Sequence, residues 1–265
     1  MYGALFMLRK MAARADIKQE TFVVASLDIS KAYDTVSHEA LWAVLQGKGI
    51  KGEWLGVVQK MYGENIIVAD TTEGATRAVD MRQGIRQGCL MSPILFALYL
   101  DWVTESLKLL NIHRTGEPTM LAYADDILVR GYSQEEVGKK LQVVVQALED
   151  LGLQINSKKS LMQVNSWGVG ELGQNWDKAQ WQVVTRKQTT CIPITRPPES
   201  FKYLGIWLDA DSDCQTNLDK LEKKVMGRLD IIEGLKANPL TKAMLIKSRV
   251  VSVINYSLGI HNAPK

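Results

Sequence analysis

Hydrophobic and polar positions along this 265-residue chain repeat with two different periods, and each change of period marks a new element. Strand-like alternation or short apolar runs occupy residues 21–29, 65–81, 121–130, 153–164 and 201–208, and the fourth of these is interrupted by the polar residues 156–159. Helical spacing occupies residues 4–14, 37–47, 53–62, 92–110 and 133–152, followed by two or three amphipathic helices after residue 215. This order predicts an α+β fold in which an antiparallel-type sheet is backed by helices, rather than a doubly wound parallel sheet.

Three serines are placed where predicted helices begin. Ser37 precedes an apolar stripe and can cap its helix, and Ser133 forms a capping box with Glu136. Ser92 stands directly before a proline, which is typical of a helix start. The region 165–200 has no clear period, but its WQVVT and TCIPIT runs are expected to pair as a hairpin.

Composition is that of a globular chain, with 46% hydrophobic and 23% charged residues. No apolar run reaches the ~18 to 20 residues that span a bilayer, and no cleavable signal pattern opens the chain. We therefore expect a soluble, intracellular protein with no membrane contact. The cysteines, Cys89, Cys191 and Cys214, are odd in number and widely separated, which indicates neither a disulfide framework nor a zinc site.

The net charge of +3 is unevenly distributed along the chain. Residues 215–265 contain nine Lys or Arg and four Asp or Glu, a balance of +5, which leaves 23 basic and 25 acidic residues upstream, a balance of −2. A basic helical end is suited to a phosphate backbone, but it is equally typical of a solvated helix face.

The first candidate for chemistry is the segment LAYADDILVR, residues 121–130, which predicts two short strands joined by an acidic turn. Asp125 and Asp126 would lie at the tip, where two unit charges ~4 Å apart repel by roughly 4 kcal/mol at an effective dielectric of ~20. A divalent cation removes that repulsion, and Mg²⁺ is commonly held by one or two carboxylates together with substrate phosphates. Taken alone, an Asp-Asp pair more often simply favours the turn.

A further acidic residue favours the metal-binding interpretation over the structural turn. Asp28 ends the apolar run of residues 21–29, and a buried unpaired charge is strongly disfavoured, so its carboxylate must reach a cleft or meet a cation. If its strand lies beside the acidic hairpin, three carboxylates converge. Without a catalytic His or nucleophilic Ser motif, such a cluster suits two-metal phosphoryl or nucleotidyl transfer.

A glycine-rich loop, residues 82–93, lies between the acidic segments. Gly84 and Gly88 permit close approach of a ligand to the backbone, and Arg86 and Gln87 offer donors beside a predicted helix N-terminus. A loop of this kind is a weak signal on its own.

Together these segments resemble the reverse transcriptases, most closely those of non-LTR (LINE-type) retrotransposons and more distantly those of group II introns. The resemblance covers nearly the whole chain, and five motifs occur in the family's order: LDISKAYDTV (motif A), RQGIRQGCLMSPILF (motif B), YADD (motif C), LGLQINSKKS (motif D) and FKYLGI (motif E). Motif B departs from the pattern, because Leu90 follows Cys89 where the family often has proline.

The resemblance implies a role for each matched residue. Asp28, Asp125 and Asp126 would ligate catalytic Mg²⁺ or Mn²⁺, with the Ile29 carbonyl as a further ligand. Tyr33 would be a gate against the ribose 2′-hydroxyl, and Arg86, Gln87 and Gly88 would lie at the incoming nucleotide. Lys159, or else Lys158, would be the general acid for the departing pyrophosphate. The primer grip would consist of Tyr203, Leu204 and Gly205. Two of these have ordinary alternatives: Tyr33 as a packed aromatic and Lys159 as part of a solvated turn.

The resemblance also implies a domain division and partners. Residues 1–210 would form the polymerase palm, with a remnant of a fingers helix at 1–16 and an insertion at 165–200, and residues 211–265 would begin a helical thumb. RNA template, DNA primer and dNTPs are the expected partners, and other domains or chains would supply the fingers and an endonuclease. The alternatives are a catalytically impaired retroelement remnant and a non-catalytic nucleic-acid-binding module. An RNA-dependent RNA polymerase is disfavoured, because Tyr33 should exclude ribonucleotides.

Overall fold

The computed structural model describes residues 2–63, 66–68, 70–72, 74–109, 117–172, 180–211 and 215–261. Cys214 and part of the 165–200 segment lie outside these ranges. No helix in the described part of the chain is long and apolar enough to cross a membrane.

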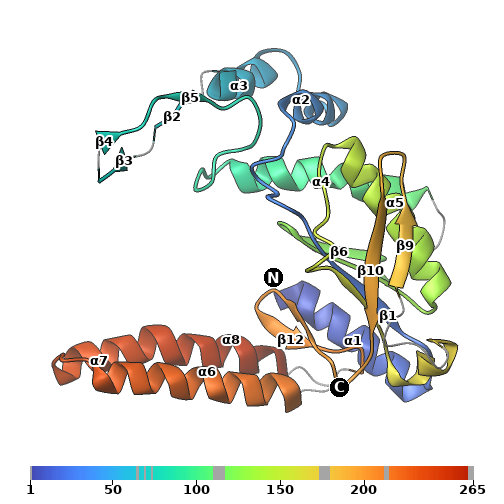
Figure 1. Ribbon diagram of the computed structural model, residues 1–265, viewed down its shortest axis with the longest axis vertical. Helices are drawn as coiled ribbons and strands as arrows, with labels where there is room; N and C mark the ends of the chain where they lie inside the picture. The colour runs from blue at the N-terminus through green and yellow to red at the C-terminus, as the bar shows by residue number, and fades with distance from the viewer. Residues whose placement is uncertain are drawn as a thin grey trace.

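A six-stranded sheet forms the centre of the molecule (Figure 1). Its strands, in spatial order, are β6 (Met120–Tyr123), β7 (Asp126–Gly131), β1 (Val23–Asp28), β8 (Leu161–Val164), β10 (Thr189–Thr195) and β9 (Gln180–Val184). Neighbouring strands are antiparallel except β8 and β10, which run parallel. The α+β fold with a largely antiparallel sheet is therefore confirmed, and so is the hairpin predicted within 165–200, as β9 and β10.

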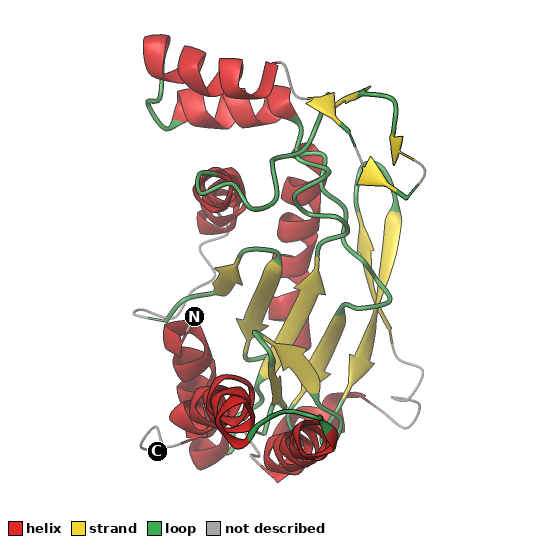
Figure 2. Ribbon diagram, turned by 90° about the vertical axis from the view of Figure 1, so that its left-hand side faces the viewer, coloured by secondary structure: helices red, strands yellow, loops and turns green. Residues whose placement is uncertain are grey.

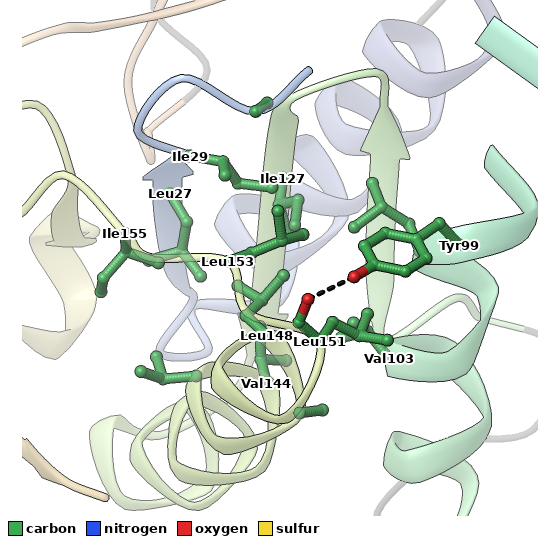
Figure 3. Packing of buried hydrophobic residues seen from close by; sticks show 14 of the residues in the cluster. Leu27, Ile29, Tyr99, Val103, Ile127, Val144, Leu148, Leu151, Leu153 and Ile155 are labelled. Atoms are coloured by element: carbon green, nitrogen blue, oxygen red, sulfur yellow. Dashed lines mark hydrogen bonds between the residues drawn. The ribbon is translucent and has the colours of Figure 1, made fainter. Parts of the chain in front are cut away.

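Each face of the sheet supports a separate apolar core, as the alternation in β1 requires. Val23, Ala25 and Leu27 pack into the core formed with α4 (Ser92–Lys108) and α5 (Gln134–Asp150). Val24 belongs to the core formed with α1 (Tyr2–Lys18). Figure 3 shows the first core, in which the buried Tyr99 hydroxyl donates a hydrogen bond to the Leu151 carbonyl.

Beyond one end of the sheet, in the upper part of Figure 1, lie α2 (His38–Gly47), α3 (Gly52–Gly63) and a narrow hairpin. The hairpin consists of the outer pair β2 (Ile66–Ile67) and β5 (Val79–Asp80) and the inner pair β3 (Asp70–Thr71) and β4 (Gly74–Ala75). The hairpin predicted at 65–81 is thus present as two short ladders.

The C-terminal part is a small hairpin followed by helices. The hairpin pairs β11 (Phe201–Tyr203) with β12 (Ile206–Leu208). The helical elements of this part are α6 (Gln215–Gly234), α7 (Pro239–Leu245), a π-helical turn (Ile246–Val251) and α8 (Ser252–His261). Elsewhere in the chain, a short 3-10 helix (Ser166–Leu172) follows β8. Helices α6 and α8 contact one another and project away from the sheet, and Figure 2 shows this part of the molecule nearly end-on, below the sheet.

The predicted helix starts are present with one difference in detail. The Ser37 hydroxyl accepts the Ala40 N–H, and the Ser133 hydroxyl accepts the Glu136 N–H, so both serines are N-caps. Ser92 is the first residue of α4, but its hydroxyl donates to the Arg86 carbonyl at 2.6 Å instead of capping the helix. The interruption predicted within the 153–164 run is confirmed, because residues 156–159 turn and strand β8 begins only at Leu161.

Candidate active site

The register of the sheet brings the strand-end acids together. β1 and β7 pair so that Asp28 lies directly opposite Asp126, and directly opposed residues share one face of a sheet. Tyr123 pairs with Asp126 across the β6–β7 hairpin, which leaves Ala124 and Asp125 as its two-residue turn. The two acids of YADD are therefore at the hairpin tip, as the sequence predicts.

A pocket of about 460 Å³ opens beside this tip. It is lined by Asp28, residues 29–33, Gln87, Asp125, Asn156 and Lys159, and we call it the tip pocket. Segments far apart in the sequence thus meet at the pocket, and most of its lining groups are polar.

The carboxylates repel one another at this tip. Burial raises the pKa of Asp126, and the negative charges of Asp125 and Asp28 raise it further, whereas the Leu204 N–H and Lys202 lower it. Asp126 does not line the tip pocket. Within the described ranges, the carboxylates as placed form no ready-made group of three or more metal-ligating His, Cys, Asp or Glu side chains.

The turn before β8 holds the end of β1 in place. The Asp28 N–H donates to the buried Ser160 hydroxyl at 3.1 Å, and the Asn156 N–H donates to the Asp28 carbonyl at 2.8 Å. The same turn carries Lys159, whose exposed Nζ lies 3.8 Å from Asp28 Oδ2. The cation of motif D is therefore a neighbour of the acid of motif A.

Tyr33 lies at the wall of the tip pocket with its ring stacked on Phe96 of α4. The ring centroids are 4.9 Å apart and the planes are inclined by 16°. Burial raises the pKa of the Tyr33 hydroxyl, and the charges of Asp125 and Tyr123 raise it further. Tyr33 is thus both packed and directed to the pocket, so the two interpretations of this residue are compatible.

The glycine-rich loop is joined to the segment that contains Tyr33. The Gly84 N–H donates to the Val36 carbonyl and the Ile85 N–H donates to the Tyr33 carbonyl, both at 2.8 Å. Gly84 has φ +89°, and a Cβ there would lie 2.9 Å from the Asp34 carbonyl oxygen, so a glycine is required. Gln87 lines the tip pocket while its amide donates to Asp34 Oδ1 at 3.1 Å.

The other two loop residues expected at the nucleotide do not line the tip pocket. The Arg86 guanidinium donates to the Met61 carbonyl at 2.8 Å and lies 5.8 Å from the centroid of the Tyr62 ring, on the side of α3. Gly88 has φ +86° with open space where a Cβ would stand. The structure therefore brings Tyr33 and Gln87 to the pocket and separates Arg86 from it.

The three motif E residues form the end of the β11–β12 hairpin. Leu204 and Gly205 are its two-residue turn, with φ values of +49° and +80°. The Tyr203 side chain is buried, and its hydroxyl has no hydrogen-bond partner in the described structure. Burial raises the pKa of this hydroxyl, as does the nearby charge of Asp126, so the hairpin end adjoins the acidic tip.

Lys31 and Asn156 are among the lining residues that were not assigned a role from the sequence. Lys31 lies between Asp28 and Tyr33, so any turn that brings both of those residues to one pocket also brings Lys31. Asn156 is in the polar interruption of the 153–164 run, and that interruption could have indicated a turn at the site.

Comparisons with known proteins agree with this geometry. A family model described as "Reverse transcriptase (RNA-dependent DNA polymerase)" matches residues 3–208. The Pol polyprotein of the type-1 retrotransposable element R2 from Popillia japonica is 28% identical over 246 residues, which cover 91% of this chain and 33% of that protein. The uncharacterized 149 kDa protein of transposon TX1 from Xenopus laevis is 26% identical over 97% of this chain and 19% of its own length.

Solved structures share the fold. The apo telomerase of Candida tropicalis superposes with a TM-score of 0.55 at 12% identity, covering 98% of this chain and 45% of the telomerase chain. The same telomerase in complex with a fragment of telomeric RNA gives 0.52 at 14% identity, covering 95% and 41%. The chain spans about a third of the length of its Popillia relative.

Proposed function

The chain belongs to the reverse transcriptase (RNA-dependent DNA polymerase) family, and from this premise we propose that it is an RNA-directed DNA polymerase domain of a non-LTR retrotransposon-like element. It would add deoxynucleotides to a primer 3′ end by two-metal nucleotidyl transfer. The observation that carries the proposal is the in-register pair Asp28 and Asp126 beside a pocket that contains Asp125 and Tyr33.

The acidic tip fits the divalent ions that reverse transcriptases use. Asp28 and Asp125 both line the tip pocket, and the mutual repulsion of the three carboxylates would be relieved by a cation. Because Mg²⁺ is commonly held by one or two carboxylates plus substrate phosphates, these two residues would hold Mg²⁺ or Mn²⁺, with Asp126 adjoining them. When bound, such ions stabilise charge on the attacking and leaving oxygens.

The remaining lining residues would bind and select the nucleotide. The ammonium groups of Lys31 and Lys159 are suited to its phosphates, and Lys159 would donate a proton to the departing pyrophosphate. The Tyr33 ring, fixed by its stack on Phe96, would exclude a ribose 2′-hydroxyl. Gln87, held by Asp34, would contact the nucleotide from the glycine-rich loop.

We assign the segments around the tip pocket to the palm and thumb of a polymerase. Residues 1–210 would be the palm and residues 211–265 the start of the thumb, whose basic helices would follow a template–primer duplex through its phosphates. Other domains or chains would supply the fingers and an endonuclease, in agreement with the greater length of the relatives.

Primer extension on an RNA template with dNTPs and Mg²⁺ tests the proposal, with and without an added fingers segment. The variant Asp125→Asn/Asp126→Asn should lose extension by at least ~10³-fold, because charge at the reacting oxygens is the main catalytic contribution. Glu135→Gln/Asp150→Asn removes the same charge from exposed positions of α5 and should extend normally.

Each outcome of this experiment has a definite meaning. Extension only with added fingers would identify a competent palm that needs that segment. A folded protein that extends under neither condition, or equal extension by both double variants, would contradict the proposal and favour the impaired remnant or the binding module.

A further inference from the structure

The glycine-rich loop is attached at its start to the chain that follows Tyr33. The Ile85 N–H donates to the Tyr33 carbonyl, and the Gly84 N–H donates to the Val36 carbonyl. Tyr33 and the loop residue Gln87 both line the tip pocket. The position of these two side chains relative to one another therefore depends on how firmly the loop is attached.

His38 holds the same attachment from the other side of Gly84. Its Nε2 lies 2.7 Å from the Gly84 carbonyl oxygen. Because a carbonyl oxygen only accepts hydrogen bonds, Nε2 carries the proton and donates it. A Cβ at Gly84 would lie 2.9 Å from the Asp34 carbonyl oxygen, so the loop backbone is packed closely at this point. Gly84 is thus bonded to backbone through its N–H and to the His38 side chain through its carbonyl.

The imidazole ring of His38 has aromatic neighbours on α2 and α3. Its centroid lies 5.7 Å from that of the Trp42 ring and 5.5 Å from that of the Tyr62 ring. The Trp42 and Tyr62 centroids are 6.2 Å apart, so the three rings form one cluster. Tilted and edge-to-face pairs at such separations attract one another. His38 therefore donates from a position that its neighbours fix, rather than as a free surface side chain.

The same ring cluster holds a second point of the loop. The Ser92 hydroxyl donates to the Arg86 carbonyl at 2.6 Å, and the Tyr62 hydroxyl lies 3.4 Å from Ser92 Oγ. Since the single hydroxyl proton of Ser92 is directed to Arg86, Tyr62 is the donor in the second contact. Helices α2 and α3 thus hold the loop at Gly84 and at Arg86, immediately before Gln87.

We propose that His38 is a positioning residue, whose hydrogen bond to the Gly84 carbonyl keeps the glycine-rich loop against the segment that contains Tyr33. His38 does not line the tip pocket, so it acts on a nucleotide through the loop and not by contact. The effect on nucleotide binding rests on the proposed function. The attachment of the loop does not, because it is a property of the folded chain without substrate.

The test compares His38→Met with His38→Gln in the full chain, without nucleotides or metal. Both new side chains are unbranched, similar in length and good helix formers, and both lack the ring, but only glutamine keeps an N–H donor. Amide hydrogen exchange followed by NMR reports on the Gly84 and Ile85 N–H groups. These should exchange roughly two- to tenfold faster in His38→Met, and His38→Gln should return them to within about twofold of the wild-type rate.

The Asn165 N–H is the reference for the fold as a whole. It donates to the Phe22 carbonyl beside the start of β1, remote from the tip, and it should exchange at the same rate in wild type and in both variants. Equal exchange of the two loop amides in wild type and His38→Met would overturn the inference. So would equal acceleration in both variants, or an acceleration that extends equally to Asn165.

Steady-state primer extension supplies a second readout that a merely structural histidine would not change in this way. His38→Met should raise the KM for dNTP roughly two- to tenfold while kcat changes by less than about twofold, and His38→Gln should restore the KM. A fall in kcat with an unchanged KM would contradict the inference. Absence of extension by the wild type would contradict only the proposed function, because the exchange rates are measured without catalysis and decide the inference separately.

Discussion

The pKa values of the carboxylates at the two ends of the β6–β7 hairpin are shifted in opposite directions. At the turn end, Asp126 has Asp28 and Asp125 as neighbours, and its pKa is raised first by burial and then by their charges. At the open end, burial alone would raise the pKa of Glu117, but the Tyr132 hydroxyl and two arginines lower it overall.

The geometry at Glu117 shows what full compensation requires in this fold. Its carboxylate lies 3.0 Å from Arg14 Nη1 and 2.9 Å from Arg130 Nη1, and it accepts a hydrogen bond of 2.7 Å from Tyr132. The chain can therefore neutralise a partly buried acid, yet it leaves the acids at the turn end in mutual repulsion. Incompletely compensated charge at one end of a hairpin whose other end is fully compensated indicates a functional site rather than a structural one.

The largest expected effect comes from breaking the compensated end. Glu117→Gln leaves the Arg130 guanidinium, whose side chain is 3% exposed, without its counter-ion. We expect the free energy of unfolding in urea to fall by roughly 3 kcal/mol. As a control, Glu135→Gln breaks an exposed pair with Lys139 and should change it by less than about 0.5 kcal/mol. Equal effects of the two substitutions would contradict the comparison.

The stability difference between wild type and Glu117→Gln should also depend on pH. Because the pKa of Glu117 is lowered in the folded state, its stabilisation is present above the unfolded pKa, about 4.3, and is lost as pH falls through the folded pKa. The difference in unfolding free energy between wild type and Glu117→Gln should be constant from about pH 7 to 5 and shrink toward about pH 3. A difference that grows on acidification would show that the sign is wrong.

A smaller effect of opposite sign is expected at the turn end. Asp126→Asn keeps the size of the side chain and removes the repulsion by Asp28 and Asp125, so without divalent ions it should raise the free energy of unfolding by roughly 1 kcal/mol. Millimolar Mg²⁺ should stabilise the wild type more than the variant, because only the wild type retains all three charges. Thermal unfolding of both proteins in chelator measures the effect of the substitution, and thermal unfolding in Mg²⁺ measures the stabilisation by the metal. A metal-free variant that is less stable than wild type would contradict the predicted repulsion.

The smallest effect on stability is expected at Lys159. Its exposed ammonium lies 3.8 Å from Asp28, so Lys159→Met should change the unfolding free energy by less than about 0.5 kcal/mol. If Lys159 donates the proton to pyrophosphate, the same substitution should slow single-nucleotide addition by roughly 10²-fold. Lys158→Met is the matched control, and equal slowing by both would remove the assignment to Lys159.

Much of this arrangement could be predicted from local pattern. Period-two alternation predicted the strand that ends in Asp28 and the strand that begins at Asp126, and the need to avoid an isolated buried charge predicted that the acids reach a cleft or a cation. Helix starts at Ser37 and Ser133 followed from side-chain chemistry that acts over three residues.

What could not be predicted depends on contacts between distant segments. The direction of Arg86, a long side chain with several accessible partners, is decided by the Met61 carbonyl and the Tyr62 ring. Leucine disfavours the conformation of Leu204, so no local rule indicates it. The hydrogen bond that its carbonyl accepts from the Tyr256 hydroxyl joins parts of the chain that sequence spacing alone does not bring together.

The position of β1 in the sheet has a consequence for how the protein is made. This strand is synthesised before the rest of the sheet, yet its partners β7 and β8 include residues as late as Gly131 and Val164. Until ribosomal synthesis has passed residue 131, both edges of β1 lack their native partners, and until it has passed residue 164 the edge that pairs with β8 still does. Loop closure over such separations is slow. The sheet around Asp28 and Asp126 is therefore completed only after β8 has been made, and a nascent chain stalled earlier would expose an apolar strand edge that is prone to aggregation.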